Sequence, residues 1–104
     1  MDNKKFCIHV DIPALEKFAL HIEFLANVSE QAAINLYAVY EESLSILETF
    51  PRACPTYPSK LYPKRELRYR IFGKRYRIVF EIIDNAVYIF DIQDCRQDND
   101  KNLI

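Results

Sequence analysis

The sequence predicts an α+β domain, in which a helical hairpin packs on one face of a mostly antiparallel four-stranded sheet. A short alternating segment comes first, two stretches with apolar residues at helical spacing follow, and three alternating segments come last. These three observations predict the order β-α-α-β-β-β. Two helices that are adjacent in such an order cover one face of the sheet. The 104 residues suffice for a single domain over 1–104, with a mostly polar tail, 97–104, that we expect to be loose.

The first half of the chain predicts a strand and two helices. Alternating apolar residues indicate a strand over residues 6–10. Pro13 fits the first turn of a helix, and apolar residues then recur at helical spacing as far as Ala26. Ser29 is a good N-cap for a second helix, which Pro51 ends. Because the connection between the helices is short, they should form an antiparallel hairpin.

The second helix carries more apolar surface than one sheet face requires. The additional stripe consists of Val39, Ile46 and Phe50. We expect this stripe either to pack under the connection that follows the helix or to form a groove that receives a partner's helix.

The second half predicts an extended connection and three strands. Prolines recur through residues 51–64, so this segment is neither regular helix nor central strand. The strands expected after it are Leu67–Phe72, Tyr76–Ile83 and Ala86–Asp94. Gly73 marks the turn between the first two.

Alternation along these strands assigns their faces. The side chains expected under the helices are those of Leu67, Tyr69, Ile71, Tyr76, Ile78, Phe80, Ile82, Tyr88, Phe90 and Ile92. The side chains expected on the open face are those of Arg68, Arg70, Arg77, Val79, Glu81, Ile83, Val87, Ile89, Asp91 and Gln93. On that face Glu81 and Asp91 could pair with the three arginines.

Basic residues are concentrated in one part of the chain. Residues 52–77 hold nine of the 14 lysines and arginines but only one of the 15 acidic residues. Arg68, Arg70 and Arg77 should therefore form a row on the open face, with Arg96 closing one end. A row of guanidinium groups binds phosphate or carboxylate, so the predicted site is an anion site.

Composition excludes several other classes of site. The chain has a single glycine, so it contains no glycine-rich phosphate loop. Its three cysteines lie far apart without C-x-x-C spacing, which indicates free thiols in a reducing cytoplasm rather than a metal site. No segment is apolar enough for a signal peptide or a membrane span. We therefore expect no cofactor, no metal and no membrane, and a cytoplasmic protein.

The sequence resembles the RelE/ParE toxin superfamily. The resemblance rests on the element order, the helix-ending Phe50-Pro51, and the strand pair 67–71 and 76–80, of which Tyr-Arg-Ile-Val-Phe is the more specific part. It extends to the closing stretches 87–90 and 94–98. Such proteins are toxins of type II toxin–antitoxin pairs, which implies a small cognate antitoxin as partner and growth arrest as outcome. The sequence leaves open whether the free toxin forms a homodimer.

The resemblance implies two different targets. RelE-like members cut mRNA on the ribosome, and ParE-like members inhibit DNA gyrase without nuclease chemistry. Arg68, Arg70, Arg77 and Arg96 match the basic positions of the ribonucleases, which implies a metal-independent endoribonuclease with these four residues at its catalytic site.

A ribonuclease also requires groups that transfer protons. Cleavage by the RNA 2′-hydroxyl needs a base and an acid as well as positive charge, and arginine is a poor base. Several relatives carry a tyrosine or histidine in the tail, whereas residues 97–104 contain neither. A ribonuclease, a gyrase inhibitor and a member that only binds its antitoxin therefore all remain as hypotheses.

Overall fold

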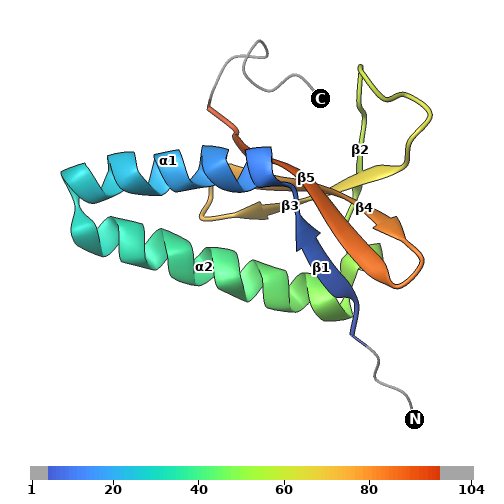
Figure 1. The fold of residues 1–104 in the computed structure, drawn as a ribbon, viewed down its shortest axis with the longest axis horizontal. Coiled ribbons are helices and arrows are strands. Elements are labelled where there is room, and N and C mark those ends of the chain that lie inside the picture. Colours follow the sequence, from blue (N-terminus) through green and yellow to red (C-terminus); the bar gives the residue numbers. More distant parts are fainter. Residues whose placement is uncertain (1–4, 97–104) are drawn as a thin grey trace.

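The computed structural model describes residues 5–96. Its elements are β1 (Cys7–Val10), α1 (Ile12–Val28), α2 (Glu30–Thr49), the short 3₁₀ helix η1 (Pro51–Ala53), β2 (Thr56–Tyr57), β3 (Leu67–Phe72), β4 (Tyr76–Ile83) and β5 (Ala86–Asp94). Figure 1 shows α1 and α2 side by side, with the strands crossing at one end of the hairpin and the junction between the helices projecting away from the sheet. The predicted α+β class is confirmed.

A single residue, Ser29, connects the two helices. Its backbone N–H donates to the carbonyl oxygen of Leu25 at the end of α1, at 2.8 Å. Its hydroxyl oxygen accepts from the N–H of Ala32 in the first turn of α2, at 3.2 Å. Ser29 thus satisfies orphan backbone groups of both helices, and its extended backbone turns the chain back on itself.

The sheet has five strands in the order β1-β5-β4-β3-β2, so the predicted four-stranded sheet is wrong in number. The additional strand is β2, which pairs antiparallel with the start of β3. Its two residues lie between Pro55 and Pro58 and are too few to produce a readable alternation. The sheet is mixed, because β1 runs parallel to β5 and the other neighbours are antiparallel.

A β-bulge in β5 changes the faces predicted for that strand. Val79 pairs with Asp91, but the next residue, Phe80, pairs with Ile89, so Phe90 is the extra residue. Before the bulge Val87 and Ile89 face the core, and Tyr88 is exposed. The prediction had these three residues the other way round, since simple alternation cannot anticipate an inserted residue. After the bulge Ile92 lies in the core as predicted.

The core lies between the helical hairpin and the sheet. Its largest buried members include Phe18 of α1, Tyr40 and Leu47 of α2, and Ile78 and Phe80 of β4. The rings of Phe18 and Tyr40 have centroids 4.5 Å apart and join the two helices. On the opposite face, Leu67 and Val79 are also buried, which shows that this face is not fully open.

Candidate functional site

The side chains of β3 face the opposite way from the prediction. Arg68 pairs with Phe80 and Arg70 pairs with Ile78, and both of these partners belong to the core between sheet and helices. Directly paired residues point to the same face, so Arg68 and Arg70 lie on the helix face. The prediction that they share the open face with Arg77 is therefore wrong.

The faces of β3 were predicted wrongly because Leu67 is buried on the side of the sheet away from the helices. Leu67 is apolar and only 1% exposed, as predicted, but it pairs with Tyr57 and Glu81 and so faces away from the helices. Side chains along a strand alternate between its two faces. If one residue is assigned to the wrong face, all the residues of that strand are therefore assigned to the wrong face. Ile71, expected in the core, is exposed on the same side.

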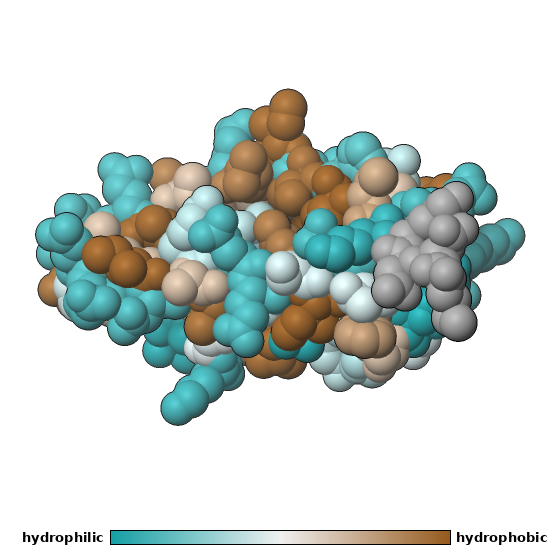
Figure 2. Space-filling model, turned by 90° about the horizontal axis from the view of Figure 1, so that it is seen from below, coloured by the Kyte–Doolittle hydropathy of each residue, from teal (hydrophilic) through white to brown (hydrophobic). Residues whose placement is uncertain are grey.

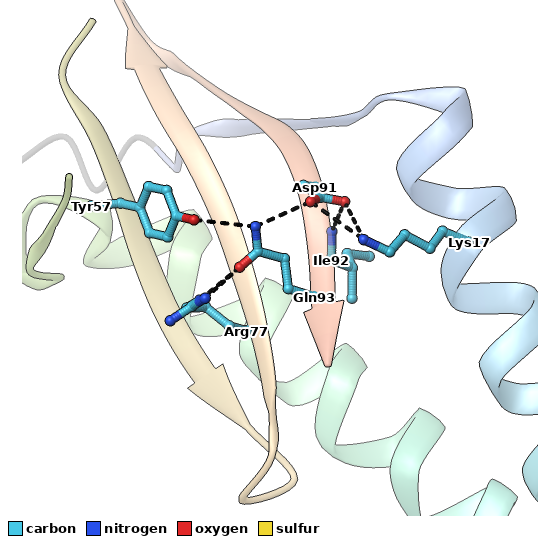
Figure 3. A network of polar contacts seen from close by, with 6 residues as sticks. All are labelled: Lys17, Tyr57, Arg77, Asp91, Ile92 and Gln93. Carbon is cyan, nitrogen blue, oxygen red and sulfur yellow. Dashed lines mark hydrogen bonds and ion pairs between the residues drawn. The ribbon is translucent and has the colours of Figure 1, made fainter. Parts of the chain in front are cut away.

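Arg77 does lie on the open face, where it joins a polar network (Figure 3). Its Nε and Nη2 donate to Oε1 of Gln93 at 2.9 and 2.5 Å. The amide nitrogen of Gln93 donates in turn to the hydroxyl of Tyr57 at 3.3 Å and to Oδ2 of Asp91 at 3.2 Å. Gln93 is fully buried, and this network satisfies both ends of its amide.

Two aromatic rings also hold the Arg77 guanidinium. Its central carbon lies 5.1 Å from the ring centroid of Tyr57 and 5.8 Å from that of Tyr69. Both distances suit a cation–π contact. Among residues 5–96 the side-chain hydrogen bonds of Arg77 go to a neutral amide and not to a carboxylate. The site therefore keeps a fixed positive charge flanked by tyrosines.

The two acidic residues of the open face pair elsewhere than expected. Oδ1 of Asp91 lies 3.2 Å from the ammonium of Lys17, which reaches it from α1. Oε1 of Glu81 lies 2.5 Å from Nη2 of Arg65, whose guanidinium also lies over the ring of Phe90 at 4.2 Å. Neither carboxylate forms an ion pair with Arg77, so neither neutralises it directly.

Arg68 and Arg70 connect β3 to other elements. Nη1 of Arg68 donates to the carbonyl oxygen of Cys54 at 2.7 Å, and its Nη2 donates to Glu66 at 2.8 Å. Nε of Arg70 donates to the hydroxyl of Ser43 in α2 at 3.2 Å. Burial raises the pKa of the Cys54 thiol, although the positive charges of Arg70 and Arg68 oppose that effect.

Arg96, the fourth arginine predicted to form the site, contacts Asp94 rather than the Arg77 network. Its Nε is 3.7 Å from Oδ1 of Asp94, a buried carboxylate that also accepts a hydrogen bond from Arg75 at 3.2 Å. Asp94 pairs with Tyr76, a core residue, and so Arg96 is tied to the helix face of β5 rather than to the Arg77 network. The predicted row of four arginines is not formed.

Two hollows border α2, and the predicted apolar stripe divides between them. Val39 lines a cavity of about 350 Å³ together with Leu36, Gly73, Lys74 and Arg75. The other hollow, of about 390 Å³, is lined by Ile46, Phe50, Ala53, Cys54, Pro55, Tyr69, Arg70 and Ile71. Phe50 is 64% exposed, whereas Val39 is partly buried against the core, so the stripe is covered in part by the chain itself.

Gln93, Tyr57 and Lys17 were not predicted as site residues. Gln93 was correctly placed on the open face, but neither its burial nor its hydrogen bond to Tyr57 could be read from the pattern. Tyr57 lies in the two-residue strand that no pattern revealed, and Lys17 reaches Asp91 across 74 positions of sequence. Within residues 5–96 no cluster of three metal-ligating side chains is present. None of the described helices is long and apolar enough to span a membrane.

The fold and the site define a small α+β domain with a fixed cation on the open face of its sheet and a hollow between α2 and β3. The sequence model for the ParE toxin of type II toxin–antitoxin systems, parDE, matches residues 12–99. The chain therefore belongs to this family of toxins, and the resemblance to the RelE/ParE superfamily is confirmed. A cognate antitoxin is the partner that membership implies. No curated protein shows significant sequence similarity to the chain.

Proposed function

We propose that this toxin acts by binding a protein target, DNA gyrase, without nuclease chemistry. One observation carries the proposal: the four arginines that would form a ribonuclease site do not share a surface. Arg77 pairs with Ile71 on the open face, whereas Arg68 and Arg70 pair with core residues of β4 on the helix face. Transition-state stabilisation of a phosphate requires several donors aimed at one point, and this distribution does not supply them.

The bonding of Arg68 and Arg70 gives further support. Arg68 donates to a backbone carbonyl and to Glu66, and Arg70 donates to Ser43, so both hold β3 to its neighbours. A catalytic role would require these donors to be free for substrate. The match to the ParE family model is consistent with the proposed inhibition of gyrase.

One feature favours mRNA cleavage as a second candidate function. Arg77 is flanked by the rings of Tyr57 and Tyr69, and tyrosines beside an arginine suit stacking on single-stranded bases. In that case the ribosome would have to position the RNA and supply proton transfer.

Expression of the toxin in a bacterium with radiolabelled precursors separates the two functions. Gyrase inhibition predicts an SOS response and filamentation while protein synthesis continues at first. Early arrest of translation with cut transcripts would overturn the proposal in favour of the ribonuclease. Arg77→Ala should weaken either effect, and Arg65→Ala is the matched control, because Arg65 lies on the same face but is already paired with Glu81.

A further inference from the structure

One nitrogen of the Arg77 guanidinium has no acceptor within the described chain. Nε and Nη2 both donate to the amide oxygen of Gln93, and within residues 5–96 Nη1 donates no hydrogen bond. The one buried side-chain nitrogen or oxygen without a partner in that range is Nε of Arg75, so Nη1 of Arg77 is not shut away from solvent. A charged donor on the open face is therefore available to an acceptor from outside.

The guanidinium of Arg77 is also held in place before any partner binds. The ring centroids of Tyr57 and Tyr69 lie 5.1 and 5.8 Å from its central carbon, and they lie 6.3 Å from each other. The hydroxyl of Tyr57 accepts in turn from the buried amide of Gln93. An arginine fixed in this way has little conformational freedom left to lose, so little of the binding energy is spent on ordering it.

The charge on this face favours one carboxylate over a run of phosphates. Nζ of Lys17 lies 3.2 Å from Oδ1 of Asp91, and Nη2 of Arg65 lies 2.5 Å from Oε1 of Glu81. Each of these two pairs is neutral, so Arg77 provides the single uncompensated positive charge among the five residues. A nucleic-acid backbone is bound by several cations along its length, and the carboxylates of Asp91 and Glu81 would repel its phosphates.

Exposed apolar surface does not by itself single out a binding site on this molecule. Phe24 of α1, Phe50 at the end of α2 and Ile71 of β3 are all exposed and lie on different elements. Figure 2, which views the molecule from below Figure 1, shows hydrophobic groups interspersed with hydrophilic ones. Ile71 differs from the other two because it pairs directly with Arg77, so that exposed apolar surface and the available cation adjoin each other there.

We propose that Arg77 is the docking point for a carboxylate of the target protein. The partner that this site fits is a segment of DNA gyrase in which an Asp or Glu stands next to an apolar residue. The carboxylate accepts from Nη1 of Arg77, and the apolar side chain packs on Ile71. This inference rests on the proposed function and adds the chemistry of the contact on the gyrase side.

Binding of purified toxin to purified gyrase in the absence of DNA tests the contact. Arg77→Gln should weaken binding about 10- to 100-fold, which corresponds to loss of a charge-assisted hydrogen bond. Arg65→Gln is the matched control and should leave the affinity unchanged, because the charge of Arg65 is already paired with Glu81. Thermal melts of both variants establish that they are folded.

The possible failures of this experiment are distinguishable. A folded Arg77→Gln variant that binds as tightly as the unchanged toxin would overturn the carboxylate contact and leave gyrase as the target. Binding that requires DNA would overturn it in favour of a phosphate. An unchanged toxin that binds no gyrase at all would overturn the proposed function, and the contact with it.

Zero-length cross-linking identifies the group on gyrase. A carbodiimide condenses a carboxylate with a primary amine that touches it, and Arg77→Lys supplies such an amine while keeping the positive charge. Mass spectrometry of the saturated complex should find position 77 of this variant joined to an Asp or Glu of gyrase. The unchanged toxin is the control, because a guanidinium is not a primary amine. A complex that forms without this cross-link would refute a carboxylate as the group bound by Arg77.

Discussion

Arg77 and Gln93 face each other on neighbouring strands, and the guanidinium donates two hydrogen bonds to one buried amide oxygen. The same amide reaches Tyr57 and Asp91, so this pair joins β2, β4 and β5. The pair gives the open face its fixed cation, and it also makes that cation part of the stability of the sheet.

Removing either partner should therefore destabilise the fold. Arg77→Met and Gln93→Leu should each lower the free energy of unfolding by about 1–3 kcal/mol, because the first leaves the buried Gln93 amide oxygen without its donor and the second leaves the half-buried Arg77 guanidinium without its acceptor. The double variant should lose less than the sum. Urea denaturation of all four proteins gives the coupling energy, which we expect to be about 1–3 kcal/mol.

The pair Arg65 and Glu81 is the matched control for that cycle. The side chain of Arg65 is 39% exposed, so solvent screens its ion pair. Its coupling should be below about 1 kcal/mol. Equal coupling in the two cycles would contradict the structural role assigned to Gln93.

Substitutions at two positions of the turn between β3 and β4 should have opposite effects on stability. Gly73 has φ +58°, and a Cβ there would lie 2.9 Å from Cδ1 of Leu36. Gly73→Ala should cost about 1–2 kcal/mol. Lys74 has φ 69° although it is not glycine. Lys74→Gly should therefore leave stability unchanged or raise it by up to about 1 kcal/mol. Chemical denaturation measures both, and a loss on Lys74→Gly as large as that on Gly73→Ala would contradict the strain argument.

His21 predicts a dependence of stability on pH. Burial lowers the pKa of His21 from its ordinary value of 6.5, an effect that nearby Asp94 partly opposes and that Lys17 and Arg75 reinforce. The unfolded chain therefore takes up a proton first as the pH falls below about 6.5. The stability that neutral His21 contributes is present above that pH and is lost as the pH falls through the folded pKa.

The variant His21→Phe isolates this contribution. The substitution keeps a ring against Tyr76, whose centroid lies 5.5 Å from that of His21. Urea midpoints at pH 7.5 and pH 5 should differ less in the variant than in the unchanged protein. An identical pH dependence in both proteins would show that His21 does not contribute.

Arg68 should prove structural rather than functional. Arg68→Ala removes hydrogen bonds to the Cys54 carbonyl and to Glu66, so it should lower the free energy of unfolding by about 1–3 kcal/mol. Toxin activity per folded molecule should persist. A variant with unchanged stability and abolished toxicity would instead return Arg68 to the functional site.

The helices and the order of the elements other than β2 could be predicted because their signals are local. Ser29, Pro51 and the apolar spacing of α1 and α2 act within a few residues of the positions that they control. The open-face positions of Arg77, Asp91 and Gln93 also followed correctly from alternation. Arg77 lies where β4 pairs regularly. Asp91 and Gln93 lie beyond the bulge of β5, where the predicted alternation matches the structure.

The remainder of the site depends on contacts between distant segments. The bulge at Phe90 and the reversed faces of β3 each change which side chains of a strand face the core. Neither changes the alternation of residues from which those faces were predicted. Leu67 is buried on the unexpected face, where its partners on the neighbouring strands are Tyr57 and Glu81. Apolar character alone therefore predicted burial correctly but assigned Leu67 to the wrong face.

We propose that this toxin binds its target, DNA gyrase, and does not cut RNA. The most direct test of this proposal is plasmid supercoiling by purified DNA gyrase with increasing amounts of the purified toxin, beside a translation reaction that contains the same toxin. If the toxin inhibits gyrase, supercoiling will fall, Arg77→Ala will weaken the inhibition, and the mRNA will stay intact. Unimpaired gyrase together with cleaved mRNA would contradict the proposal.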